Sequence, residues 1–550
     1  MHRKILCLAL ICALISPTAV FAENTDSVST FDSYEQYDFS TFSNADNNID
    51  SAVEYVIAEI AENQPDIIDI SKFKIPYDPH SQTNEFISKF KNSILFEHPE
   101  LFYLSAYFKY SYTYDGFLTD IIMNEPVDVI DSNGNIIQEM PYTMDKEEIA
   151  RRQASIDKET NHILSLVDDN MTPLQKVLIV HDYIVANYTY DYSYNSSSLD
   201  SMIIDKTGVC QGYAYLFYHI MTQLDIPCIN VPSEECRHIW NKVQLDGEWY
   251  NIDVTHDDPK QNNTLIDYSA GNKRTHFLVS DNELKSFAEK EDTDPLSCKY
   301  HYVWNNEDYC VADDDSYSDS ILRSISSLTV YKDEKFYCFD SDNNFCTIDF
   351  EKNVLKPVCN TVADSKWLPY GQTASMYAAS FSAPVLFDGD IYFNSPDKIY
   401  KFDTKTNKAE IFCTYDGKTD ISNTYFYGLR VIDNKMYAEY SENPNNEPTL
   451  IMIAESAPSL PCSSEITDGT VQNGFFVTTD IPEDIKDTTE VYVAQYDKHG
   501  IFIGFAVNAA ETDGGQEQFV YGNNCKTIKI LIWNKYLLSP LANVTKREFN

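Results

Sequence analysis

Residues 208–224 read GVCQGYAYLFYHIMTQL, and their apolar side chains recur at the spacing of an α-helix. Gly208 permits a tight turn, so we expect Cys210 at or just before the start of that helix. The free N–H groups and the positive end of the helix dipole stabilise a thiolate there, and can also stabilise an oxyanion on a substrate. Cys210 alone leaves two interpretations open, a nucleophile or a buried structural cysteine.

The segment downstream predicts a β-hairpin. HIWNKVQL (238–245) and EWYNIDVT (248–255) flank Asp246-Gly247, the strongest signal for a two-residue turn. Such a turn pairs residue 245 with residue 248 and, counted outward, Trp240 with Asp253. His238 and Asp253 then become diagonal neighbours on one face of the hairpin.

The opposite face of this hairpin is apolar and is expected to pack on the core: Ile239, Val243, Leu245, Tyr250, Ile252 and Val254. A histidine and an aspartate are thereby held on one side of a rigid platform. This arrangement suits an aspartate that orients a histidine, which in turn activates a thiol.

GVCQGYA and RHIWNKVQLDGEWYNIDVTHDDP together resemble the core of the transglutaminase-like superfamily. The order of Cys, His and Asp, the glycine before the cysteine and the hairpin all match. The resemblance implies a papain-like fold in which Cys210 is the nucleophile, His238 the base and acid, and Asp253 the residue that orients His238. It is strong over about residues 170–310, where HFLVSDNEL (276–284) and KYHYVWNN (299–306) are similar to the closing segments of secreted bacterial members.

The resemblance implies an acyl-transfer enzyme acting on a peptide bond or a glutamine carboxamide, with water or an amine as acceptor. The superfamily includes transglutaminases, proteases and deamidases, and the motifs do not separate them. We expect hydrolysis to exceed transamidation, and we expect neither a metal nor an organic cofactor. The alternative from another class is a catalytically silent surface-binding protein that uses this domain as a scaffold.

Four further residues near these motifs have a side chain that suits a role in the site. Tyr190, in NYTYD, is a candidate for the second oxyanion donor beside the Cys210 N–H. His219 is expected to be structural. His256 precedes Asp257 and Asp258, but without a second His or Cys at ligand spacing we expect a solvated turn there rather than a metal site. Trp240 either lines the substrate cleft or packs in the core.

The N-terminus is typical of a signal peptide. Arg3 and Lys4 precede the apolar run ILCLALICALI, and small residues allow cleavage after Ala22. We therefore expect a secreted or cell-surface protein that leaves the membrane once the signal is removed.

The cysteine count allows disulfide bonds. Two of the thirteen cysteines lie in the signal peptide, and Cys210 is expected to remain a thiol. The other ten form an even number that could pair in an oxidising compartment.

Composition restricts the partners. The chain has 550 residues and a formal charge of −44, so nucleic acid is an unsuitable ligand. A protein or peptide substrate is expected, and a cell-wall or matrix component is a further candidate. The acidity is spread along the chain, as in a solvated extracellular surface.

The pattern along the chain predicts a multidomain α+β protein in which a papain-like, transglutaminase-like core is followed by all-β modules. Three similar segments, KDEKFYCF, FDGDIYFNSPDKIYKFD and IDNKMYAEY, favour propeller-like repeats, and the last stretch favours a small β-sandwich. We expect these β modules to be separable from the catalytic unit. The predicted parts are a signal peptide (1–22), a disordered acidic leader (23–49), an α+β domain (50–143), the catalytic domain (144–320), a propeller-like region (321–456) and a β-sandwich (457–550).

Overall fold

The computed structural model describes most of the chain between residues 47 and 548. The described residues are 47–78, 84–130, 134–233, 237–258, 274–290, 302, 304, 310–325, 327–367, 377–378, 381–382, 384–414, 426–432, 434–441, 449–455, 463–468, 474–481, 488–498, 501–509, 516–520, 525–534, 539–540 and 545–548. The predicted signal peptide and nearly all of the predicted leader lie outside them. The chain divides into two compact units, residues 1–145 with 159–455 and residues 146–158 with 456–550.

The first unit starts with a small α+β region. Ala52, Val56 and Ile60 recur every four residues on the first helix and are fully buried, so this helix presents one apolar stripe to the core. The elements are α2 (Asn47–Asn63), β1 (Ile67–Asp69), α3 (Glu85–Asn92) with the π-helical turn η3 (Ser93–Glu97), β2 (Lys109–Tyr112), β3 (Leu118–Ile122), β4 (Val127–Ile130) and β5 (Ile136–Glu139).

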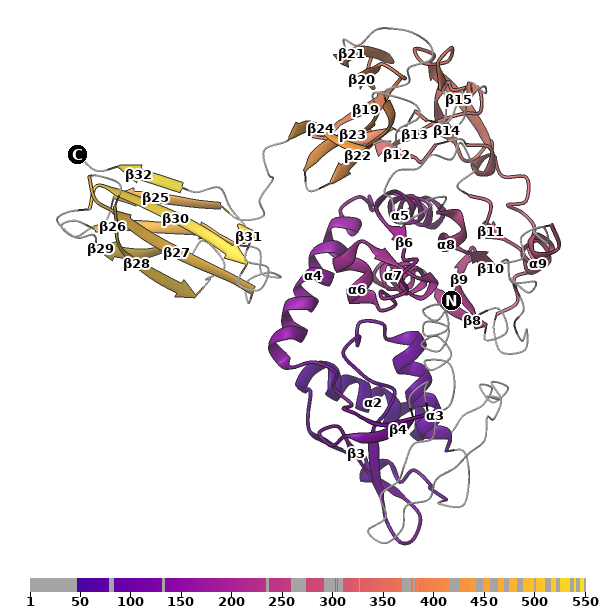
Figure 1. The fold of residues 1–550 in the computed structure, drawn as a ribbon, viewed down its shortest axis with the longest axis vertical. Coiled ribbons are helices and arrows are strands. Elements are labelled where there is room, and N and C mark those ends of the chain that lie inside the picture. The colour runs from indigo at the N-terminus through magenta and orange to yellow at the C-terminus, as the bar shows by residue number, and fades with distance from the viewer. Residues whose placement is uncertain are drawn as a thin grey trace. The chain divides into compact units, whose positions relative to one another are not determined.

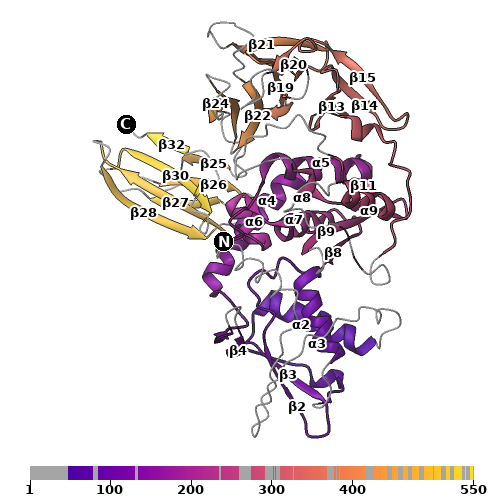
Figure 2. The ribbon, with the colours of Figure 1, turned by 45° about the vertical axis from the view of Figure 1, so that its right-hand side comes forward.

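The central part of this unit packs helices on an antiparallel sheet with strand order β11-β10-β9-β8. Figures 1 and 2 show helix α7 beside strand β9, and α7 contacts both β8 and β9. The elements are α5 (Pro173–Asn187), β6 (Thr189–Tyr190), α6 (Leu199–Asp205), β7 (Thr207–Gly208), α7 (Cys210–Gln223), β8 (Cys228–Ser233), β9 (His238–Leu245), β10 (Glu248–Ile252), α8 (Val254–Asp257), β11 (Phe277–Val279) and α9 (Asp281–Lys290).

Local sequence explains where α5 begins. The Thr172 hydroxyl accepts from the Gln175 N–H, and the Gln175 side chain accepts in return from the Thr172 N–H. Pro173 occupies the first turn, where its missing N–H costs nothing. The start of this helix is thereby fixed, which sets the position of His181 and Asp182 two turns later.

The β-rich part of the first unit consists of successive antiparallel sheets, with strand orders β12-β13-β14-β15, β18-β19-β20-β21 and β22-β23-β24, and a separate pair β16-β17. Each of the three similar sequence segments lies in one of these sheets and contains its hairpin turn. The bounds are η4 (Ile321–Ser324), β12 (Val330–Lys332), β13 (Lys335–Phe339), β14 (Phe345–Asp349), β15 (Val354–Cys359), β16 (Lys366–Trp367), β17 (Tyr377–Ala378), β18 (Val385–Phe387), β19 (Asp390–Asn394), β20 (Lys398–Asp403), β21 (Lys408–Thr414), β22 (Phe426–Ile432), β23 (Lys435–Tyr440) and β24 (Thr449–Glu455).

The second unit holds the first part of helix α4 (Lys146–Leu164) and two antiparallel sheets. One sheet has the order β25-β26-β29; the other has the order β28-β27-β30-β31, with β32 also paired to β30. The bounds are β25 (Ser463–Asp468), β26 (Gly474–Asp480), β27 (Thr489–Tyr496), β28 (Phe502–Ala509), β29 (Gln516–Val520), β30 (Thr527–Asn534), β31 (Ser539–Pro540) and β32 (Thr545–Glu548).

The fold is therefore mixed, with a helix-and-sheet core and many β-sheets, as the sequence predicts at the coarse level. Among the described strands no sheet closes on itself, and the propeller and sandwich stay predictions. No helix in the described part of the chain is both long and apolar enough to cross a membrane.

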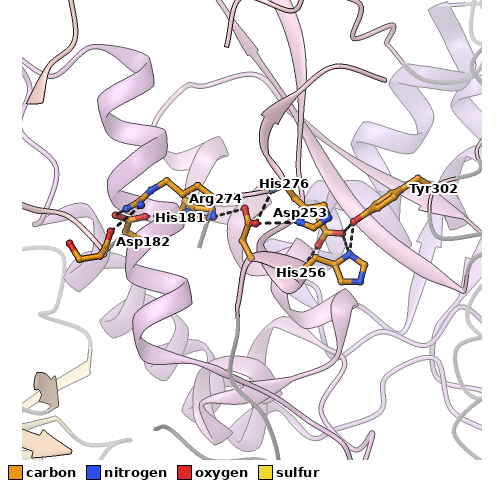
Figure 3. A network of polar contacts seen from close by, with 9 residues as sticks. His181, Asp182, Asp253, His256, Arg274, His276 and Tyr302 are labelled. Atoms are coloured by element: carbon orange, nitrogen blue, oxygen red, sulfur yellow. Dashed lines mark hydrogen bonds and ion pairs between the residues drawn. The ribbon is translucent and has the colours of Figure 1, made fainter. Parts of the chain in front are cut away.

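A buried polar network joins the β-rich part to helix α5 (Figure 3). Asp182 on α5 accepts from the Thr329 N–H and hydroxyl, each at 2.7 Å, and pairs with the guanidinium of Arg274. Arg274 is fully buried and donates to the Ser327 carbonyl at 3.0 Å. The expectation that everything after residue 320 can be removed is therefore revised, because residues 327–329 help to satisfy groups that are buried beside α5.

We expect Asp182→Asn to destabilise the protein by about 3 kcal/mol or more, because it removes the carboxylate that neutralises a buried guanidinium. Chemical denaturation followed by tryptophan fluorescence measures this loss. Asp390→Asn is the control, since Asp390 pairs with Lys332 and Lys401 at the surface and its loss should cost much less. Equal effects of the two substitutions would contradict a stabilising role for the buried network.

Candidate active site

Cys210 is the first residue of helix α7, as its sequence context predicts. Strand β7 leads into it and pairs in parallel with β6, so that Tyr190 lies opposite Gly208. The Asp191 N–H donates to the Gly208 carbonyl at 2.9 Å, and the Val209 N–H donates to the Ser196 carbonyl at 2.8 Å. These bonds fix the backbone immediately before the cysteine.

The reason for the glycine at 208 differs from the expected one. Gly208 is not in a tight turn and does not have a positive φ; it ends strand β7. A Cβ atom at this position would lie 2.3 Å from the buried Met202 Sδ. Glycine therefore allows α6 to pack closely against the segment that carries Cys210.

The hairpin has the predicted register. Leu245 pairs with Glu248, and the pairing continues outward to Asn241 with Ile252. Asp246 and Gly247 have φ values of 52° and 94°, as a two-residue turn of this kind requires. His238 and Asp253 therefore reach one side of the hairpin, where His238 Nε2 and Asp253 Oδ2 are 2.6 Å apart.

Cys210 completes this row of side chains. The Cys210 side chain lies close enough to the His238 ring to raise the pKa of that ring, whose Nε2 is occupied by Asp253. Cys210 and Asp253 are both almost fully buried. A thiol at a helix start, an imidazole and a carboxylate thus follow one another, which is the order that nucleophilic catalysis by cysteine requires.

Comparison with known families agrees with this geometry. Residues 163–254 match the model of the transglutaminase-like superfamily. This segment is a transglutaminase-like core. It contains Cys210, His238 and Asp253, and it confirms the superfamily that the motifs indicated. None of the curated proteins compared with the chain matches it.

Electrostatics in the transglutaminase-like core favour a charged His238. Burial opposes a cationic ring, but the Asp253 carboxylate and the contact with Cys210 outweigh burial and raise the pKa of His238 well above its usual value. Burial alone would likewise raise the pKa of Asp253, whereas the His256 and His238 rings hold it well below its usual range. The site therefore favours an imidazolium at His238 beside an ionised Asp253 carboxylate.

Two residues that the sequence did not assign to the site also contact Asp253 (Figure 3). The Tyr302 hydroxyl donates to Asp253 Oδ2 at 2.7 Å, and His256 Nδ1 lies 2.8 Å from the same oxygen. The His256 N–H donates to Asp253 Oδ1 at 3.1 Å, because Asp253 is the N-cap of helix α8. The expected solvated turn at His256 is correct only in part: the residue is exposed, but it lies in helix α8 and its ring contacts Asp253.

Sequence patterns did not predict these contacts. Tyr302 lies in KYHYVWNN, which resembles a closing segment of the superfamily's domain, and it is 49 residues from Asp253. His256 has no second His or Cys at ligand spacing nearby in the sequence, because His238, which contacts the same carboxylate, lies across the hairpin. His276 is a third residue that the sequence did not assign to the site. Its N–H donates to the buried Asp257, which His181 also contacts.

The remaining candidates have clear positions. Trp240 packs in the core against Tyr302 and Trp304, and its indole N–H donates to Asn251, so it does not line an open cleft. His219 is buried and contacts the Thr160 hydroxyl at 3.0 Å, which agrees with a structural role.

Tyr190 lies close to Cys210. Burial raises the pKa of its hydroxyl, and the charge of Cys210 raises it further. Tyr190 is therefore protonated and can donate a hydrogen bond next to the nucleophile, as an oxyanion donor must.

No disulfide joins any two of the eight cysteines in the described part of the chain: Cys210, Cys228, Cys310, Cys338, Cys346, Cys359, Cys413 and Cys525. The pairing that the even count allowed is not found among them; Cys236, Cys298 and Cys462 lie outside the described residues. Burial raises the pKa values of Cys228 and Cys338, and that of Cys346 to about 12, so these thiols stay protonated near neutral pH.

We expect brief treatment with iodoacetamide at neutral pH to alkylate Cys210 before any other cysteine of the folded chain, because it begins helix α7 beside the His238 ring, whose pKa is raised. Asp253→Asn should slow this reaction at least about tenfold at pH 7. The substitution removes a cause of the raised His238 pKa, so the ring loses its charge at a lower pH. Peptide mapping by mass spectrometry measures both rates.

Asp314→Asn is the control for this pH effect, since Asp314 accepts from the Tyr250 hydroxyl away from Cys210. Its alkylation profile against pH should match that of the unmodified protein. Preferential alkylation of a different cysteine, or an unchanged profile in Asp253→Asn, would contradict the assigned pairing.

Proposed function

We propose that this protein is a cysteine-dependent acyl-transfer enzyme, with Cys210 as nucleophile, His238 as base and acid, and Asp253 as the group that orients His238. The observation that carries the proposal is the contact order Cys210–His238–Asp253 at the start of helix α7. The match of residues 163–254 to the transglutaminase-like superfamily supports it.

The chemistry follows from the two ring nitrogens of His238. Nε2 is held by Asp253, so the other nitrogen, Nδ1, exchanges a proton with Cys210. The thiolate attacks a carboxamide or peptide carbonyl, the new S–C bond forms, and the Nδ1 proton passes to the leaving amine as the C–N bond breaks. Water then gives its proton to Nδ1 and attacks the thioester, which releases the acid and regenerates the thiol.

An oxyanion forms on the substrate in both steps. The N–H groups at the start of α7, including that of Cys210, point to the region where it develops. Tyr190 supplies a second donor from β6, on the strand pair that leads to the same helix. Preorganised donors of this kind usually contribute a large share of the rate.

A peptide or protein is the proposed substrate, with a cell-wall or matrix component as a second candidate. The pattern of residues 1–22 supports action outside the cell, at the surface or in the medium. We favour water over an amine as acceptor, because water is always abundant and no described feature marks an amine site. The rival function, a silent binding protein, would require a Cys210 that does not react.

The direct test uses the purified full chain with a glutamine-containing peptide and with a mixture of unmodified peptides. We expect release of ammonia or peptide cleavage to exceed incorporation of an added primary amine. Cys210→Ser should abolish each reaction and leave the fold unchanged by circular dichroism. If Cys210 reacts with iodoacetamide but no peptide is cleaved, deamidated or modified, the binding-protein alternative is supported instead.

The same assay tests Tyr190. Tyr190→Phe should lower kcat by about 100-fold, with a small effect on KM, because the hydroxyl stabilises charge that develops only in the transition state. Tyr192→Phe is the matched control, since Tyr192 is half-exposed in the same segment and should keep full activity. A normal kcat in Tyr190→Phe would assign the second donor to another group.

A further inference from the structure

The site contains one more metal-ligating side chain than a cysteine triad needs. A ring nitrogen of His238, a carboxylate oxygen of Asp253 and a ring nitrogen of His256 all lie within 4.8 Å of one another. An orienting aspartate requires a single histidine. Here His238 Nε2 and His256 Nδ1 approach the same oxygen, Asp253 Oδ2, at 2.6 Å and 2.8 Å.

The three ligand atoms come from separate elements and are already held in place. His238 begins β9, Asp253 follows β10, and His256 lies in α8. The two rings are tilted by 33°, with centroids 4.7 Å apart, and one nitrogen of each approaches Asp253 Oδ2. The Tyr302 hydroxyl contacts both Asp253 Oδ2 and His256 Nδ1, so a metal would replace its contact with His256 and leave its hydrogen bond to the carboxylate as outer support.

We propose that His238, Asp253 and His256 form a reversible Zn²⁺ site that blocks the proposed catalytic cycle. Two imidazoles and one carboxylate with an open fourth position are a ligand set that Zn²⁺ accepts, whereas Ca²⁺ and Mg²⁺ prefer oxygen ligands alone. In a tetrahedral site the ligand atoms lie roughly 3.3 Å apart. Each nitrogen would therefore move away from Asp253 Oδ2, from 2.6 Å and 2.8 Å, while ligand atoms now up to 4.8 Å apart would draw together.

Charge also favours a cation at this position. Asp253 supplies one negative charge, and the whole chain carries a formal charge of −44, which raises the local concentration of divalent cations. Binding would release the proton from His238 Nε2 to water as the Zn–N bond forms. Cys210 is not in this ligand group, so the metal would occupy the side of His238 that faces away from the nucleophile.

Inhibition follows from the chemistry of the histidine. With Nε2 bound to zinc, the only proton left on the ring is at Nδ1, and it is held far more tightly than the proton of an imidazolium. The leaving amine would then lack its acid, so acyl transfer would stop before the C–N bond breaks. This part of the inference rests on the proposed function, whereas zinc binding itself does not.

The binding test uses the full chain freed of metal with a chelator and titrated with Zn²⁺ against a chromophoric zinc chelator. We expect one tight site per chain. His256→Asn should weaken it at least about 100-fold, since even supporting residues around metals cost 10–100-fold. His98→Ala is the control, because His98 contacts Glu100 on another part of the unit and should leave the affinity unchanged. Equal affinity in His256→Asn and the unmodified chain would overturn the site.

Cobalt(II) reports the ligands directly and does not depend on activity. The unmodified chain should give the visible bands of a four-coordinate site without a sulfur charge-transfer band, and Cys210→Ser should give the same spectrum. His256→Cys should retain binding and gain the sulfur band, which also shows that a substitution at 256 leaves the site folded. A sulfur band in the unmodified chain, or loss of binding in Cys210→Ser, would assign the metal to the thiol and overturn the proposal.

Activity measured with and without zinc distinguishes the inhibitory zinc site from the proposed acyl-transfer function. Zinc should inhibit the unmodified enzyme at concentrations that fill the tight site, and a chelator should restore the activity fully. Zinc that fills the site of an active enzyme without slowing it would overturn the inhibitory role alone. A chain that binds zinc through His256 but shows no activity on any peptide would leave the metal site standing and refute the proposed function.

Discussion

The buried carboxylate of Asp253 is the group on which this site depends. A charge with 1% exposure is tolerated only when partners replace the lost water, and Asp253 accepts or pairs with His238, His256, Tyr302 and the N–H of His256. The same residue terminates the hairpin and caps helix α8. Asp253 thus follows a strand, caps a helix and contacts His238. The alignment of His238 is therefore set by backbone structure as well as by the Asp253 side chain.

Helix α8 extends this arrangement across the core. It is only four residues long, yet its Asp257 contacts His181 on α5 and the N–H of His276 beside β11. His181 in turn contacts Asp182, which holds Arg274. Asp253 and Asp182 are therefore linked by the backbone of helix α8, in which the Asp257 N–H donates to the Asp253 carbonyl, and by the buried contacts from Asp257 through His181 to Asp182.

Short stretches of sequence predicted the hairpin and the helix start that form part of the site. Asp246-Gly247 and the alternation around it defined the register that brings His238 to Asp253, and helical spacing placed Cys210 at a helix start. Tyr302 and Arg274 escaped because they meet their partners across 49 and 92 residues, and nothing in a short window records such contacts. Likewise, the three similar segments each form a hairpin in a separate antiparallel sheet, but whether such sheets close into a propeller depends on contacts between repeats, which no single segment records.

The link between Asp182 and Thr329 has a consequence for biosynthesis. Chains emerge from the ribosome from the N-terminus onward and fold as their parts become available. When residue 310 has emerged, every member of the proposed triad is present, but Asp182 still lacks the hydroxyl and N–H of Thr329, and Arg274 still lacks the Ser327 carbonyl. The nascent chain therefore holds the proposed nucleophile before it holds the segment that completes the core around it, and the last bonds of the Asp182 network form only after synthesis has entered the β-rich part.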